Sequence, residues 1–193
     1  MKKIIFTLKV VLILGIALTA CSTPPTEEMQ RAQDAVIRAE SDPEAVAYGG
    51  NALIRARDAL TRMQSEADAK RYDTAKEFAA EAISNAERAI TDGQTGATRA
   101  RSEAENLLYS LADPLAETSS ALSTARQVEN LILDFSALSQ DMDLARRIYD
   151  EAWQDLGNDN NQGAIDKGQN VRSMLSDINS KILDAAQTTS RKQ

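Results

Sequence analysis

Apolar residues recur three and four positions apart along most of the chain after residue 26, which places them on one face of an α-helix. No segment alternates apolar and polar residues as a strand does, and the commonest residues are good helix formers. The sequence therefore predicts an all-α fold. Four apolar stripes carry the pattern: Leu53, Ala56, Leu60, Met63 and Ala67; Ala75, Phe78, Ala79, Ala82 and Ala86; Leu144, Ile148, Ala152 and Leu156; Val171, Leu175, Ile178 and Ile182.

Two Asp-Pro pairs predict helix starts, because aspartate is a good N-cap and proline suits the first helical position. Asp42-Pro43 indicates one such start. Asp113-Pro114 indicates a second, although a kinked continuous helix is an alternative at this point.

Glycines predict the helix ends. Gly93 and Gly96 indicate one stop, and the segment from Gly157 to Gly163 indicates another. The predicted helices span residues 27–41, 43–69, 73–91, 97–112, 114–135, 140–156 and 162–187.

Many positions on the apolar stripes are alanine, which lets two helices approach closely. We therefore expect antiparallel helical hairpins, arranged either in a tetratricopeptide-like manner or as a short helical bundle. A coiled coil fits less well, because no heptad pattern of large apolar residues persists.

A weak internal repeat agrees with the hairpins. Shifting the chain by 89 residues places Ala56-Arg57 on Ala145-Arg146 and Ala75 on Ala164. Each half then consists of a helix, a short turn and a second helix. Chance alignment of alanine-rich helices is the alternative explanation.

The first 20 residues have the organisation of an export signal. Three lysines are followed by the apolar run from Val10 to Leu18 and by the small residues Thr19 and Ala20. A membrane-spanning helix needs about 20 apolar residues, so this run is too short to span a bilayer. We expect residues 1–20 to be cleaved.

The segment Leu18-Thr19-Ala20-Cys21 resembles the bacterial lipobox. The resemblance implies that Cys21, the only cysteine, carries covalent lipid and anchors the chain in a bilayer; a cleaved signal followed by a free thiol is the alternative. In bacterial lipoproteins a residue such as Ser22 after the cysteine accompanies outer-membrane sorting. The expected location is therefore the periplasmic face of the outer membrane, with surface exposure left open.

The expected mature chain has a tether at residues 21–26, helical regions at 27–92 and 97–187, and a polar tail at 188–193. Removal of the three signal lysines leaves 19 basic against 29 acidic residues, a net charge near −10. Such a chain gains no counterion-release energy from nucleic acid, so we expect no nucleic-acid partner.

Residues that carry catalysis are scarce. The chain has no histidine, its one cysteine is assigned to lipid, and no serine lies in a Gly-x-Ser-x-Gly turn. The loop from Gly157 to Gly163 lacks the first aspartate and final glutamate of a calcium-binding EF-hand loop. We expect no enzyme activity, no metal and no cofactor other than the lipid on Cys21.

Tyr149 and Trp153 lie one turn apart in a chain with few aromatic residues. They are the candidate lining of a recognition groove, because tyrosine and tryptophan are enriched at interfaces. Packing beside the core is the structural alternative.

Residues 22–92 resemble a family of alanine-rich bacterial envelope domains of unknown function. The resemblance rests on the lipobox, the Pro24-Pro25 tether and two long helices joined by a turn at Arg71-Tyr72-Asp73, which with Thr74-Ala75 is similar to a tetratricopeptide helix. We expect a non-catalytic module that binds an envelope protein. A carrier or sensor of a small apolar ligand or lipid is the alternative.

Overall fold

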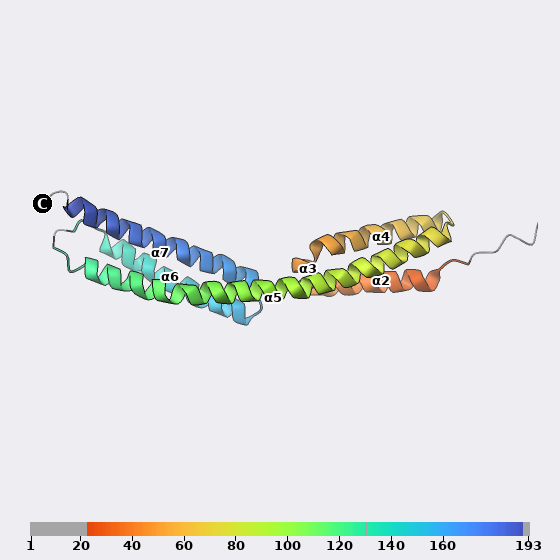
Figure 1. Cartoon of the computed structure of the whole chain (residues 1–193), viewed down its shortest axis with the longest axis horizontal. Helices are drawn as coiled ribbons and strands as arrows, with labels where there is room; N and C mark the ends of the chain where they lie inside the picture. The colour runs from red at the N-terminus through yellow and green to blue at the C-terminus, as the bar shows by residue number, and fades with distance from the viewer. Residues whose placement is uncertain (1–22, 130, 191–193) are drawn as a thin grey trace, which may run out of the picture. The chain divides into compact units, whose positions relative to one another are not determined.

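The computed structural model describes residues 23–129 and 131–190, and every regular element in these ranges is a helix (Figure 1). The all-α prediction, with helices packed antiparallel, is confirmed. Cys21 and the predicted signal lie outside the described residues. The helices are α2 (Thr26–Ser41), α3 (Pro43–Tyr48), α4 (Gly50–Asp68), α5 (Tyr72–Ala125), α6 (Phe135–Gly157) and α7 (Asn161–Ser190).

The chain divides into a first unit that ends at Gly93 and a second unit that begins at Gln94. The helix α5 contributes its first part to one unit and its second part to the other. A tetratricopeptide-like arrangement would consist of separate helical hairpins, whereas α5 belongs to both units. Each unit is therefore better described as a short helical bundle.

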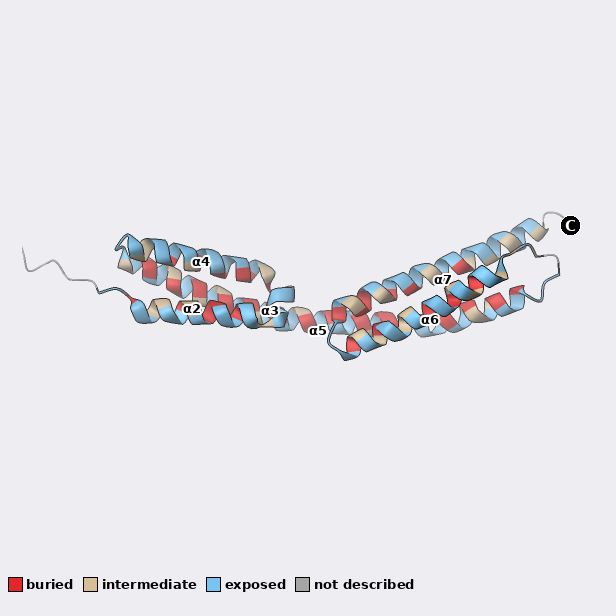
Figure 2. Cartoon of the chain, turned by 180° about the vertical axis from the view of Figure 1, so that it is seen from behind, coloured by how far each residue is buried: buried red, intermediate tan, exposed pale blue. Residues whose placement is uncertain are grey.

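The first unit packs α2, α3, α4 and the start of α5 around a core made mostly of alanine (Figure 2). Because alanine side chains are short, the backbones come very close. A Cβ atom added at Gly49 would lie 2.2 Å from the carbonyl oxygen of Ala89, and one at Gly93 would lie 2.6 Å from the amide nitrogen of Ala45. Glycine at these two positions therefore permits the contact between α3 and α5.

The predicted helix stop at Gly93 and Gly96 is wrong, because α5 continues through both residues for 54 residues. Gly93 is buried and faces the backbone of α3, so it serves a close helix contact and not a chain reversal. Pro114 also lies inside α5. Of the two alternatives at Asp113-Pro114, the continuous helix is therefore the one observed, and no new helix starts there.

Other boundaries shift by smaller amounts. Asp42 caps α3 as predicted, accepting hydrogen bonds from the amides of Glu44 and Ala45. Gly49 divides the predicted helix 43–69 into α3 and α4. The predicted helix 114–135 ends instead at Ala125, and α7 extends to Ser190, inside the segment expected to be a polar tail.

The helix α6 begins five residues earlier than predicted, at Phe135 instead of residue 140. The Asp134 side chain explains this start, since it accepts hydrogen bonds from the amides of Ser136 and Ala137 at 3.1 and 3.0 Å.

The second unit packs the later part of α5 with α6 and α7 around larger side chains, among them Leu108, Leu111 and Ile178. Asn179 of α7 donates a hydrogen bond to the buried hydroxyl of Thr118 on α5 at 2.8 Å. Near the start of α7, the Asn161 side chain donates to the carbonyl oxygen of Ala97. These two contacts show that α7 runs parallel to α5, with α6 antiparallel to both.

The repeat of 89 residues is present in the structure. The α4–α5 turn follows Asp68 and the α6–α7 turn follows Gly157, 89 residues later. The left-handed residues Lys70 (φ 59°) and Asp159 (φ 60°) are also 89 residues apart. Matching backbone bonds close both turns: the Arg71 amide donates to the Glu66 carbonyl and the Asn160 amide to the Asp155 carbonyl, each at 2.9 Å. Both units thus share one helix–turn–helix design.

Replacing Lys70 with glycine should raise the free energy of unfolding by about 0.5–1 kcal/mol, because glycine avoids the left-handed strain that a side chain meets there. Thermal unfolding monitored by circular dichroism measures the effect. Ala69→Gly is the matched control and should destabilise, since Ala69 has φ −76°. Equal losses of stability in the two variants would contradict the assignment of Lys70 as a strained turn residue.

Candidate functional site

Three of the eight aromatic residues gather on the second unit, where α5 lies against α6. Tyr109 of α5 meets Trp153 of α6 edge to face, with ring centroids 5.1 Å apart. The ring centroid of Tyr149 lies 6.3 Å from that of Trp153, and this contact is also edge to face. We call Tyr109, Tyr149 and Trp153 the aromatic cluster.

The cluster extends from the core to the surface. The Tyr149 hydroxyl donates a hydrogen bond to the Leu108 carbonyl at 3.1 Å, which fixes this ring partly inside the bundle. Trp153 is half-buried, and Tyr109 is 69% exposed. Tyr149 is therefore held against the bundle, while Trp153 and Tyr109 present ring surface to solvent.

Tyr109 is the member that sequence reasoning missed. It directly follows the buried Leu107 and Leu108, so its own position in the helical stripe gives no sign of a cluster. The signal that could have found it is scarcity, because the chain has only four tyrosines and one tryptophan.

Two exposed carboxylates flank the exposed rings. Asp113 lies one helical turn after Tyr109, and Asp150 lies three residues before Trp153, so each is a neighbour of a ring on its own helix. Neither carboxylate has an ion pair among the residues that the structure describes. The exposed Arg147 lies three residues before Asp150 on α6, so a cation shares this part of the surface with the two unpaired carboxylates.

Several other charged groups nearby have partners. Glu105 pairs with Arg101 at 3.2 Å, and the same Arg101 bonds Asp159 at 2.8 Å. Arg146 donates a hydrogen bond to the Ser119 hydroxyl at 2.6 Å. These side chains are therefore committed to contacts within the second unit.

A separate polar group closes the α6–α7 turn. Lys167 bonds Asp155 at 2.7 Å and approaches Glu151 at 3.9 Å. The hydrogen bond from Lys167 holds the pKa of Asp155 below its ordinary value, and the same bond raises the pKa of Lys167. Within residues 23–129 and 131–190, no three acidic, cysteine or histidine side chains gather as metal ligands. These three residues, Glu151, Asp155 and Lys167, link the end of α6 to the start of α7, and we call them the clasp.

This clasp should give the second unit a pH-dependent stability. A lowered aspartate pKa stabilises the fold above about pH 4, and this contribution is lost as the pH falls through the folded-state pKa of Asp155. Lys167→Met should therefore lower the melting temperature at pH 7, and should lower it by less at pH 2. Lys181→Met, which removes a longer and more exposed contact to Asp141, should have a smaller effect at pH 7. Equal losses for Lys167→Met at both pH values would contradict the clasp.

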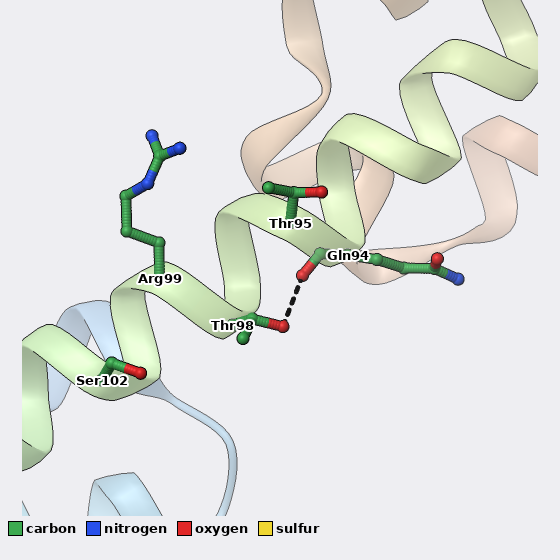
Figure 3. Close-up of a pocket in the computed structure, with 5 residues that line it drawn as sticks. All are labelled: Gln94, Thr95, Thr98, Arg99 and Ser102. Atoms are coloured by element: carbon green, nitrogen blue, oxygen red, sulfur yellow. Dashed lines mark hydrogen bonds between the residues drawn. The ribbon is translucent and has the colours of Figure 1, made fainter.

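The surface of α5 also forms a hollow of about 550 Å³, lined by Gln94, Thr95, Thr98, Arg99 and Ser102 (Figure 3). All five residues belong to one helix, and the Thr98 hydroxyl donates to the Gln94 carbonyl at 2.9 Å. The hollow is open and presents hydroxyl, amide and guanidinium groups.

Comparison with known families assigns the N-terminal part of the chain. Residues 27–107 match the DUF4398 family, a domain of unknown function. The resemblance to a family of unknown function is confirmed within this range. The matched range ends just before Tyr109, so the aromatic cluster lies outside it. Neither the curated proteins nor the solved structures contain a match.

None of the helices between residues 23 and 190 is long and apolar enough to cross a bilayer.

Proposed function

We propose that the protein is a lipid-anchored lipoprotein of the cell envelope and acts as a non-catalytic helical module that binds another envelope protein. Its contact surface is the aromatic cluster. The observation that carries this proposal is the 69% exposure of Tyr109 in edge-to-face contact with Trp153. Exposed tyrosine and tryptophan on a rigid scaffold are typical of binding hot spots.

The charge arrangement supports a binding role over a catalytic one. Histidine is absent from the sequence. Several carboxylates pair with an arginine one turn away on the same helix, as Glu27 does with Arg31 and Asp58 with Arg62. Such pairs are solvated surface and supply no group poised for acid–base chemistry.

The anchor part of the proposal rests on the lipobox ending at Cys21. Several acyl chains on one cysteine hold a protein on a bilayer stably, since each buried methylene contributes about 0.8 kcal/mol. Ser22 supports the outer membrane as the location. We propose the periplasmic face, with surface exposure as the alternative.

A photo-reactive amino acid placed at residue 109 of the full-length protein tests the proposal in living cells. We expect irradiation to yield a discrete adduct with one envelope protein. The control position is Arg172, an exposed residue of α7. Absence of an adduct at residue 109, or the same adducts at both positions, would count against the aromatic cluster as the contact surface.

A further inference from the structure

The protein covers two of its other aromatic rings with its own arginines. The guanidinium carbon of Arg62 lies 5.8 Å from the centre of the Phe78 ring, and that of Arg126 lies 6.0 Å from the centre of the Phe135 ring. Both distances fall within the range of cation–π attraction.

The aromatic cluster differs from those two rings. Over Tyr109 and Trp153 no arginine or lysine is placed among the described residues, although tryptophan is the best side chain for binding a cation. The flanking carboxylates of Asp113 and Asp150 are exposed and have no ion pair there. A positive group bound at this surface would therefore meet exposed ring surface and two carboxylates that have no ion pair in the described part of the chain.

We propose that the aromatic cluster receives a lysine- or arginine-rich segment of the partner protein, with one cationic side chain against Trp153 and Tyr109 and its neighbours paired with Asp113 and Asp150. This inference rests on the proposed function and names the chemistry of the partner. Charge complementarity selects this occupant, since the chain has a net charge of −7 and repels an acidic segment. The exposed charges also disfavour an apolar helix as the occupant.

The single tryptophan makes the test direct, because all tryptophan fluorescence comes from Trp153. Full-length protein in a neutral detergent is titrated with hexalysine and, separately, with hexaglutamate. We expect a saturable fluorescence change with hexalysine and none with hexaglutamate. The double variant Asp113→Asn/Asp150→Asn should bind hexalysine about tenfold more weakly, since two ion pairs are lost.

The control variant Glu77→Gln/Glu81→Gln removes the same charge from exposed positions of the first unit and should bind as the unmodified protein does. Tyr109→Ala keeps every charge and should also weaken binding. Circular dichroism checks that each variant is folded. Equal hexalysine affinity in the two double variants, or no response to hexalysine, would overturn the cationic partner. If hexalysine does not bind but the crosslinked adduct at residue 109 forms in cells, the cationic partner is wrong and the proposed interaction module is retained. If neither hexalysine binding nor the adduct is observed, both proposals are wrong.

Discussion

Replacing Gly93 with alanine should destabilise the first unit by about 3 kcal/mol, a large loss for a single methyl group. The added Cβ would lie 2.6 Å from the Ala45 nitrogen and 2.7 Å from the Ala45 Cα. Both are backbone atoms, so no side-chain rotation can relieve the overlap. Thermal or urea unfolding monitored by circular dichroism measures the loss.

The direction of this effect is diagnostic, because alanine inside a helix is normally more stable than glycine by up to about 1 kcal/mol. Gly50→Ala is the matched control, since its Cβ would meet nothing within 4 Å. Gly168→Ala should cost less than Gly93→Ala but more than Gly50→Ala, because its Cβ would meet buried side-chain atoms of Leu107 and Leu108 and no backbone. If Gly93→Ala is as stable as Gly50→Ala, then α3 does not pack on α5 as described.

Replacing Cys21 with alanine should move nearly all of the protein from the membrane fraction to the soluble fraction. Lipid on Cys21 is the proposed anchor, and no described helix can take over its role. Cell fractionation followed by immunoblotting measures the shift. The helix content by circular dichroism should stay unchanged, because the fold begins after the tether.

Ser22→Ala is the control for this variant and should remain with the membrane. Retention of Cys21→Ala in membranes after washing without detergent would contradict the lipoprotein assignment. Loss of Ser22→Ala from the membranes would instead point to a general defect in export.

The local pattern of apolar and polar residues was sufficient to predict most of the helices. The apolar stripes predicted the helices because a buried helix face requires apolar residues three and four positions apart, whatever partner it packs on. The turn after Gly157 and the cap at Asp42 were also predictable, because each depends on residues that are adjacent in sequence. The 89-residue shift likewise aligned positions that the structure repeats.

The continuous helix through Gly93 was not predictable from local pattern. Glycine has a low helix propensity, and in isolation it indicates an end. What keeps the helix intact is the close approach of Ala45, which lies 48 positions earlier and whose proximity depends on how α3 packs. Tertiary contact therefore outweighed propensity at this residue.

Two of the three residues of the aromatic cluster were predictable from the sequence, and the third was not, for a similar reason. Tyr149 and Trp153 are neighbours on one helix, so their spacing alone brings them together. Tyr109 joins them across the pairing of α5 with α6, and no local pattern reveals which turns of two helices will meet.

We expect Tyr109 and Trp153 to contact a partner in the cell. Hydroxyl-radical footprinting of the full-length protein, in intact cells and after purification, compares the accessibility of individual rings. Both residues should react several-fold more slowly in cells, while Tyr48 and Tyr72 of the first unit should react at the same rate in both states. Equal reaction rates of Tyr109 and Trp153 in cells and in the purified protein would contradict this contact.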